Sequence, residues 1–304
     1  MSSISESVSQ RTTLGYLEEH YGFRLEPSYA TMVTVTSMAN DIASIRPGCL
    51  FVPQTGQETA TDPQKMPLTR ADLEEAIANG AYAMVLPEPM RALLPDDPVP
   101  VLYGELQAGR LGELASHIAA DPSQTLAVFA VTGTDDAMIA QDVHELAQFL
   151  HMLGNPVATV SAAESQSLER VLDLQYPLDT LAMQQVLSVC LEDGAAAVII
   201  AMDERTLQPE AMQAVQVDVI GCDGVTAPRE TQQYVAAMCR HFGCPQTGKT
   251  QVVGRTEESD MMALQSNADQ DQVRSLSLTI AMAMAAGIRK NSIKSVLRVT
   301  REMH

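Results

Sequence analysis

The chain has 304 residues, 46% apolar and 19% charged, and is therefore long enough for about two globular domains, each with its own hydrophobic core. Its 38 acidic and 19 basic residues give a formal net charge of −19, which argues against nucleic acid and against an anionic membrane surface as partners, because both attract clustered Lys and Arg. No signal peptide, membrane-spanning run or paired cysteine spacing is evident, so we expect a cytoplasmic protein in a reducing compartment.

Short strands and helices alternate along the first part of the chain, 1–121. Apolar runs predict strands at 31–38, 49–53, 81–87 and 98–104, and helices at 69–80 and ending near His117. The helix at 69–80 has the clearest end signals, since Thr69 and Asp72 have the spacing of a capping box and Gly80 is placed to cap its C-terminus. This order of elements predicts an α/β domain.

A short polar joint at 121–123 is predicted to lead into the second part, 122–304, which again places strands before helices. The predicted elements, in chain order, are a buried strand at 126–131, a helix at 141–153, a strand at 155–162, a helix at 178–193, a buried strand at 195–202, an apolar helix at 273–288 closed by Gly287, and an amphipathic helix at 291–303. We therefore expect a second α/β domain with a mostly parallel sheet.

The segment 125–141 has the strand, glycine turn and helix start of a phosphate-binding loop but not its functional side chains. A working loop needs a Lys on the outer phosphates and a hydroxyl on Mg²⁺. Five residues stand in the equivalent of the ATP loop: Gly133, Thr134, Asp135, Asp136 and Ala137. Each of the two carboxylates would repel a phosphate oxygen by about 1 kcal/mol, yet both suit the N-terminus of a helix. We therefore expect a capped helix start and no nucleotide cofactor.

A second segment, 243–250, matches the pattern G-x-x-x-x-G-K-T in every position. A nucleotide-binding loop of this kind leaves a strand and opens a helix. Here an amphipathic helical segment precedes the pattern and a strand-like TQVVG follows it. The context predicts a helix-to-strand turn and not a second nucleotide site.

Four further residues, Cys222, Cys239, His241 and Cys244, are of types that ligate zinc. Their spacing matches no regular zinc motif, and cysteine is commonly a small buried apolar residue. No metal is therefore expected at these positions.

Three other groups have a functional and a structural interpretation, and the structural one is favoured each time. The acidic cluster Asp203, Glu204 and Glu210 is either a magnesium site or a solvated strand-to-loop edge with an ion pair to Arg205. His144 and His151 share one face of a helix, which favours surface or groove packing. Met282 and Met284 could form an adaptable interface, but packing in the hydrophobic core is favoured for both.

Taken in order, several segments resemble the muramyl-peptide (Mur) ligases of bacterial cell-wall synthesis. The closest type is the MurE-like UDP-N-acetylmuramoyl-tripeptide synthetase, which adds the third peptide residue to UDP-N-acetylmuramoyl-dipeptide. The segments that carry the resemblance are 45–52 (V-x-P-G-D-L-F-V in the family), 78–85, 115–121 with the following VTGT, 181–207, 217–219 (F-D-V) and 234–237 (Y-F-A-A). The resemblance implies an N-terminal uridine-binding type of domain over 1–121 and a central ATPase-type domain over 122–304, and leaves no counterpart for the family's C-terminal domain.

The departures from the family fall on its functional positions. Its loop G-T-N-G-K-T-T corresponds to 133–139, where the Lys and the magnesium-binding hydroxyl are both replaced. Its magnesium-binding acid aligns with Ala201, its S-S-H motif with 203–205 and its carbamylated lysine with Met238. Its uridine-domain motif D-S-R retains one residue of three, Asp41. The resemblance thus implies a catalytic site emptied of its chemistry.

Three hypotheses follow from this resemblance. The leading one is a catalytically inactive Mur-ligase-like protein that acts by binding a protein partner or a second copy of itself in peptidoglycan-precursor synthesis. The second is an ATP-dependent amide ligase that uses Mg-ATP through non-standard ligands or takes its third domain from another chain. The third is a sensor that binds a UDP-muramyl peptide without turnover through a uridine pocket at Asp41, Phe51 and Gln57.

Overall fold

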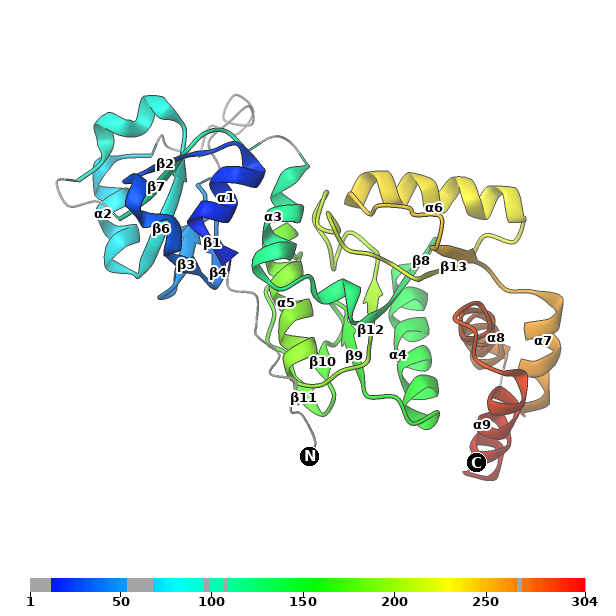
Figure 1. Cartoon of the computed structure of the whole chain (residues 1–304). Helices are drawn as coiled ribbons and strands as arrows, with labels where there is room; N and C mark the ends of the chain where they lie inside the picture. The colour runs from blue at the N-terminus through cyan, green and yellow to red at the C-terminus, as the bar shows by residue number, and fades with distance from the viewer. Residues whose placement is uncertain (1–11, 54–67, 96–98, 107–108, 267–269, 304) are drawn as a thin grey trace. The chain divides into compact units, whose positions relative to one another are not determined.

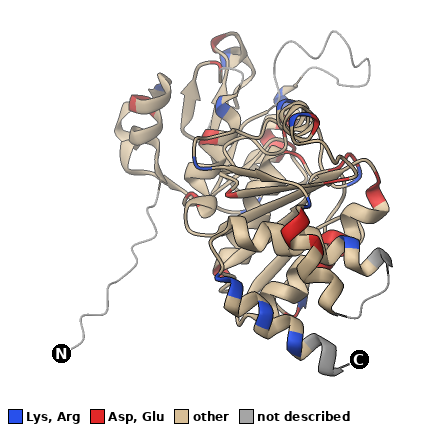
Figure 2. Cartoon of the chain, turned by 90° about the vertical axis from the view of Figure 1, so that its right-hand side faces the viewer, with Lys and Arg blue, Asp and Glu red and all other residues tan. Residues whose placement is uncertain are grey.

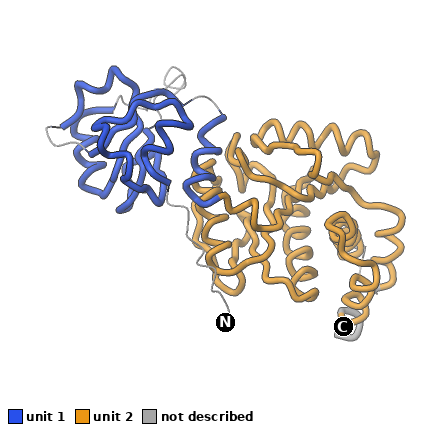
Figure 3. The backbone as a smooth tube through the Cα atoms, in the orientation of Figure 1, with its two compact units in different colours: residues 1–120 blue, residues 121–304 orange. Residues whose placement is uncertain are grey.

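The computed structural model describes residues 12–53, 68–95, 99–106, 109–266 and 270–303, which form two compact units, 1–120 and 121–304 (Figure 3). Each unit is built on its own sheet, and each is described by itself. Within the described residues, no helix is long and apolar enough to cross a membrane.

Unit 1 contains a mostly parallel sheet of five strands (Figure 1). Its strands, in spatial order, are β2 (Arg24–Glu26), β7 (Val101–Tyr103), β6 (Ala81–Leu86), β5 (Cys49–Phe51) and β4 (Ser37–Ala39). Only the pairing of β2 with β7 is antiparallel in this sheet. The sheet packs its two faces against separate apolar clusters that contain Leu50 and Phe51 respectively.

The strand predicted at 31–38 is not continuous, which corrects the sequence prediction. The first two residues of the predicted strand belong to a 3₁₀ turn, η1 (Ser28–Met32). Two short strands follow this turn, β3 (Thr34–Val35) and β4. Strand β3 pairs with β1 (Thr12–Thr13), whereas β4 pairs with β5, so the backbone changes partner at Thr36. The apolar pattern of 31–38 does not depend on which strand each residue pairs with. It therefore could not indicate the break between β3 and β4.

The helices of unit 1 are α1 (Leu14–Tyr21), α2 (Arg70–Ala78) and α3 (Arg110–Ile118). The predicted capping box of α2 is confirmed, since the Thr69 hydroxyl accepts from the Asp72 backbone N–H and the Asp72 carboxylate accepts from the Thr69 N–H. The C-cap of α2 is Asn79, whereas the sequence predicted Gly80 at this position. Gly80 follows with a φ of 108°, where a Cβ would lie 2.9 Å from the backbone of Pro47.

Unit 2 is built on a seven-stranded sheet that is parallel except at one edge, as predicted for the second domain (Figure 1). Its strands, in spatial order, are β11 (Arg170–Val171), β10 (Gln166–Ser167), β9 (Val157–Val160), β12 (Ala197–Ala201), β8 (Ala127–Gly133), β13 (Val219–Asp223) and β14 (Gln251–Val253). Strands β10 and β11 form the antiparallel edge.

Helices cover both faces of this sheet, and this explains why β8 is apolar at consecutive positions. The helices of unit 2 are α4 (Asp136–Met152), α5 (Thr180–Glu192), α6 (Pro228–Phe242), α7 (Glu257–Ala263), α8 (Gln270–Ala285) and α9 (Lys290–Met303). Val128 and Ala130 belong to the core under α5 and α6, whereas Phe129 and Val131 belong to the core under α4 and α8. Met282 of α8 lies in the second core, which confirms its predicted packing role.

The terminal helix α9 is amphipathic, as predicted. Ile293, Val296 and Leu297 are buried against α7 and α8, while Lys294 and Arg298 are exposed. Basic residues recur along this helix in Figure 2 although the chain as a whole is acidic.

The polar joint predicted at 121–123 lies at the start of unit 2, and part of it is buried. It forms a 3₁₀ turn, η4 (Pro122–Gln124), in which Pro122 and Ser123 are buried. The Ser123 hydroxyl accepts from the backbone N–H of Gln216 at 3.2 Å. The bond holds η4 against a distant part of unit 2, where Pro122 and Ser123 are buried although their residue types are common in exposed turns.

Candidate functional site

The candidate site lies where the parallel strands β8 and β13 end, because the carboxyl ends of such strands meet the starts of the following helices. Gly133 and Asp223 are opposite each other in the ladder. A Cβ on Gly133 would lie 2.9 Å from the Asp223 carbonyl, and one on Gly224 would lie 2.2 Å from Thr134 Oγ1. The two turns are thus in contact, and their backbones approach at positions that only glycine fits.

The helix that follows Gly133 begins with an occupied cap, as predicted. Asp135 is the N-cap of α4, and its carboxylate accepts from the Ala137 N–H at 2.9 Å. Asp136 is the first residue of the helix. The negative charges face the positive end of the helix dipole, which an anionic ligand would otherwise use.

Tyr234 links helix α6 to the turn at Gly133. Its hydroxyl, from α6, donates to the carbonyl of Gly133 at 2.5 Å. Burial raises the pKa of the Tyr234 phenol, so the group stays a hydrogen-bond donor at neutral pH. The backbone of Gly133 is therefore held from the side opposite α4.

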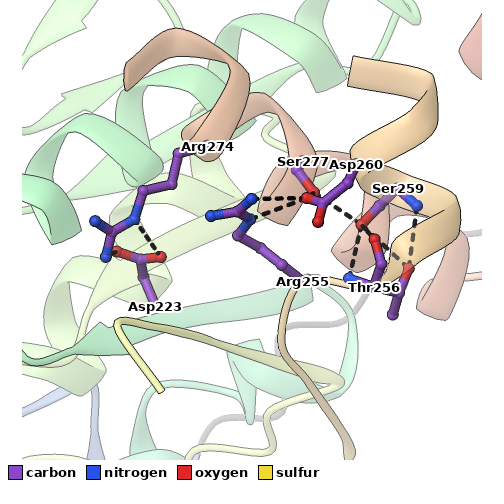
Figure 4. Close-up of polar contacts among 7 residues, drawn as sticks. All are labelled: Asp223, Arg255, Thr256, Ser259, Asp260, Arg274 and Ser277. Carbon is purple, nitrogen blue, oxygen red and sulfur yellow. Dashed lines mark hydrogen bonds and ion pairs between the residues drawn. The ribbon is translucent and has the colours of Figure 1, made fainter. Parts of the chain in front are cut away.

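Arg274, from α8, closes the other side of the site (Figure 4). Its guanidinium donates to both oxygens of Asp223, from Nε at 3.1 Å and from an Nη at 2.6 Å. The Asp223 side chain is 4% exposed and that of Arg274 is 38% exposed. The hydrogen bond to Asp223 raises the pKa of Arg274 above its ordinary value, and Asp142 and Asp135 add to the effect. The cation nearest this turn is thus already neutralised by a bidentate partner.

Asp142 is a second buried carboxylate of this region. It lies on the apolar stripe of α4 with Ile139, Val143 and Leu146, and is 2% exposed. By distance and angle neither of its oxygens makes a hydrogen bond, although the Ser275 hydroxyl lies near enough to act on the carboxylate. Burial raises the pKa of Asp142 from 3.8 to about 7, while the neighbouring Ser275 on α8 opposes the shift.

Arg274 and Asp142 were not among the residues predicted from the sequence, although both carry a recognisable signal. Arg274 is a single charge in the otherwise uncharged stretch 272–288, and Asp142 occupies a core position of its helix. A charge on the apolar face of a helix needs a partner or a shifted pKa. The signal identifies such a residue but not what it meets.

A second polar network lies beside the ion pair and fixes α7 against α8 (Figure 4). Arg255 donates to Asp260 at 3.0 and 2.9 Å, and Ser277 of α8 donates to the same carboxylate at 2.6 Å. Burial opposes the shift, but these bonds hold the pKa of Asp260 below its usual value. A capping box of Thr256 and Ser259 begins α7. These groups satisfy one another, so the network is structural.

Two residues of the predicted uridine pocket lie in different environments, Asp41 in an exposed turn and Phe51 in the hydrophobic core. Asp41 accepts from the backbone N–H and the hydroxyl of Ser44 in an exposed turn. Phe51 is 1% exposed and packs in the core of unit 1. Gln57 lies outside the described residues. The pocket stays a prediction.

The G-x-x-x-x-G-K-T segment is a helix-to-strand turn, as predicted. It starts where α6 ends, with Gly243 at a φ of 69°, and leads into β14. The hydroxyl of Thr247 accepts from the Lys249 N–H, and that of Thr250 accepts from the Thr247 N–H. The turn bonds to itself and opens no helix, so it lacks the structural context of a phosphate site.

The acidic cluster differs from its prediction in two respects. Asp203 is buried and accepts from the backbone N–H groups of Arg205 and Thr206, so it is not a solvated edge. The basic side chain that Glu204 contacts is that of His241, at 3.8 Å, and not that of Arg205. Among the residues that the structure describes, no three His, Cys, Asp or Glu side chains form a metal-binding group.

His144 and His151 border a groove, which confirms one of their two expected packing modes. The groove has a volume of about 1200 Å³ and lies between α4 and the edge strands β9 to β11. Its polar walls contain three internal pairs: His144 with Gln148, Gln166 with Glu164, and Arg170 with Asp193. These side chains are satisfied by one another.

Replacing the cap of α4 tests its structural role. We expect Asp135→Ala to lower the free energy of unfolding by about 1 kcal/mol, because the Ala137 N–H loses its partner and the helix dipole its counter-charge. Asp135→Ser, which keeps a cap acceptor, should recover most of the loss. Urea unfolding followed by far-ultraviolet circular dichroism measures both. Equal stability of the alanine variant and the unsubstituted chain would show that the cap contributes nothing.

Comparisons with known proteins give a consistent result, although no family model matches the chain. A curated UDP-N-acetylmuramoyl-L-alanyl-D-glutamate–2,6-diaminopimelate ligase of Xanthomonas campestris is 28% identical over 216 residues, 69% of this chain and 41% of the relative. The enzyme of the same name from Pseudomonas putida is 26% identical over 221 residues, 69% of this chain and 42% of its own length. The chain thus spans less than half the length of the relatives that it matches.

Solved structures of the same group share the fold. A UDP-N-acetylmuramoyl-L-alanyl-D-glutamate–2,6-diaminopimelate ligase superposes with a TM-score of 0.57 at 13% identity, covering 96% of this chain and 67% of the other. MurF from Acinetobacter baumannii superposes with a TM-score of 0.54 at 12% identity, covering 95% and 67%. The predicted resemblance to the MurE-like Mur ligases is therefore confirmed by these relatives, and the fold agrees with solved structures of Mur ligases.

Proposed function

We propose that this chain is a Mur-ligase-like protein without ligase activity that acts by binding in peptidoglycan-precursor synthesis, with another protein or a second copy of itself as its partner. The observation that carries the proposal is the bond from the Ala137 N–H to the Asp135 carboxylate. The N-terminus of the helix after a phosphate loop is the part that binds phosphate, and here a side chain of the same loop occupies it.

The surrounding charges support the same conclusion. Asp135 and Asp136 present two carboxylates at the turn, and the guanidinium of Arg274 is already bound by the buried Asp223. Asp135 and Asp136 would each oppose a phosphate by about 1 kcal/mol or more. Neither Lys nor hydroxyl stands at Ala137 or Met138, where a working loop carries them. The residues present therefore do not fit Mg-ATP.

The relatives' names give the pathway and favour one other candidate function. They are named as ligases that join diaminopimelate to UDP-N-acetylmuramoyl-L-alanyl-D-glutamate. ATP-dependent ligation with non-standard ligands is therefore the second candidate, and it requires this chain to bind Mg-ATP. Binding of a UDP-muramyl peptide without ATP would instead indicate a sensor.

The decisive experiment is the melting temperature of the chain in concentration series of Mg-ATP and, separately, of UDP-N-acetylmuramoyl-L-alanyl-D-glutamate. A ligand that binds only the folded state raises the melting temperature by mass action. We expect no shift with Mg-ATP up to millimolar concentration. A saturable shift that Thr134→Val abolishes would contradict the proposal and establish the ligase candidate.

A loop variant provides the matched control. Combining Asp135→Asn, Asp136→Gly, Ala137→Lys and Met138→Thr restores the family's loop sequence over positions 133–138 on this backbone. If the loop chemistry is what the chain lacks, this variant gains a saturable Mg-ATP shift that the unsubstituted chain does not show. A folded variant without a shift would place the defect outside the loop, and would overturn the argument from Asp135.

A further inference from the structure

The C-terminal end of helix α6 brings two cysteines together. Gly243 follows the helix with a φ of 69°, and its N–H donates to the Cys239 carbonyl. The N–H of Cys244 donates to the same carbonyl at 2.8 Å. This is the six-to-one bond of a Schellman motif, in which the side chains at the two ends of the bond are commonly in contact. Here those two side chains are thiols.

The two thiols lie close enough to affect each other's ionisation, and the side-chain amide of Gln246 donates to Cys239 Sγ at 3.5 Å. The neighbouring Cys244 thiol lowers the pKa of Cys239, whereas the Cys239 sulfur and burial raise the pKa of Cys244. The pair thus consists of one sulfur favoured as thiolate and one held as thiol.

The helix end that carries the pair is held in place. The carbonyl of His241 accepts from the Glu210 N–H at 3.1 Å, and that of Phe242 accepts from the Met212 N–H at 2.8 Å. With the Cys239 carbonyl also bonded, the last turn has little freedom. The separation of the two cysteines is therefore set by the backbone of this turn.

One neighbour of this pair lies at the surface. Cys239 and Cys244 are 4% and 6% exposed, and the exposed Gln246 donates to Cys239 Sγ. Rotation of the Gln246 side chain is therefore the step that we expect to admit a small reagent to this sulfur.

The other cysteines lack this arrangement. Burial raises the pKa of Cys49, and it raises those of Cys190 and Cys222 to about 11. No second cysteine is among the groups that act on any of the three. They are buried thiols of low reactivity, and so serve as internal controls.

We propose that Cys239 and Cys244 form a modification site, a dithiol that hydrogen peroxide converts into an intramolecular disulfide. In the first step the Cys239 thiolate attacks one peroxide oxygen, so that an S–O bond forms, the O–O bond breaks and hydroxide leaves. In the second step the Cys244 sulfur displaces the hydroxyl of this sulfenic acid, and its proton leaves with that hydroxyl as water. The two sulfurs lose two electrons in total, and the peroxide is reduced to two waters.

The test is peptide mapping of the folded full-length chain after brief exposure to hydrogen peroxide and alkylation of the remaining thiols. Trypsin cleaves after Arg240, between the two cysteines, so the disulfide links peptides 230–240 and 241–249. We expect this linked species, and a loss of free thiol at Cys239 and Cys244 about tenfold faster than at Cys49, Cys190 and Cys222. Reduction should separate the two peptides.

Two controls make the result interpretable. In the Cys244→Ser variant the reaction should stop at Cys239 sulfenic acid, which dimedone traps. In urea the preference for this pair over the other cysteines should disappear, because the Schellman contact is lost. Oxidation of the folded chain at equal rates at all five cysteines, or linkage of other pairs, would overturn the proposal, as would resistance of Cys239 to peroxide.

Discussion

Replacing Arg274 by methionine is expected to lower the free energy of unfolding by about 3 kcal/mol at neutral pH. Asp223 is 4% exposed, and both of its oxygens bind Arg274. Without the guanidinium a buried carboxylate remains without its partner, and this costs more than the net gain from an ion pair. Urea unfolding followed by far-ultraviolet circular dichroism measures the change.

Two further variants show that the unpaired charge is the cause. Adding Asp223→Asn to Arg274→Met should recover more than half of the loss, because the buried charge is then gone. Arg255→Met removes a guanidinium from an ion pair whose side chains are 37% and 38% exposed, and should cost less than about 1 kcal/mol. Equal losses in Arg274→Met and Arg255→Met would contradict the argument.

Replacing Asp142 by asparagine is expected to raise stability at pH 8, by up to about 4 kcal/mol. Burial raises the pKa of Asp142 from 3.8 in the unfolded chain to about 7 in the folded one. A tenfold change in an acid dissociation constant corresponds to about 1.4 kcal/mol. Asparagine has nearly the same shape and carries no charge, so it does not incur this cost.

The sign of the pH dependence provides the sharper test. Between pH 4 and pH 7 the folded state binds more protons at Asp142 than the unfolded state does, so the stability of the unsubstituted chain falls as the pH rises through this window. The difference between Asp142→Asn and the unsubstituted chain should therefore grow from near zero at pH 4 to its full size above pH 7. The exposed Asp173→Asn serves as control and should show no such growth. A difference that is constant with pH would contradict the raised pKa.

Several local features, and the residues missing from the loop, could be predicted from the sequence. The capping box of Thr69 and Asp72, the capped start of α4 at Asp135 and the turn at 243–250 were all predictable, because each depends on residues within one or two turns of the chain. The apolar runs of β8 and β12 also predicted buried strands correctly. The absence of a Lys at position 137 and of a hydroxyl residue at position 138 is likewise evident without a structure.

The partners of charged residues were not predictable in this way. Arg274 and Asp223 are 51 residues apart, and their pairing depends on how α8 packs against β13. The sequence grouped His241 with Cys239 and Cys244 as metal-ligand types, whereas the fold pairs His241 with Glu204 and leaves the two thiols with each other.

The sequence by itself thus determined the class of fold, the order of many elements, and the absence of a Lys at position 137 and of a hydroxyl residue at position 138, since all of these follow from residue type and short-range periodicity. Only the tertiary structure decided that Arg274 pairs with Asp223, that Asp142 is buried, and that β3 and β4 pair with different strands. The physical reason is that the apolar pattern specifies which face of an element is buried, but not which distant group that face meets.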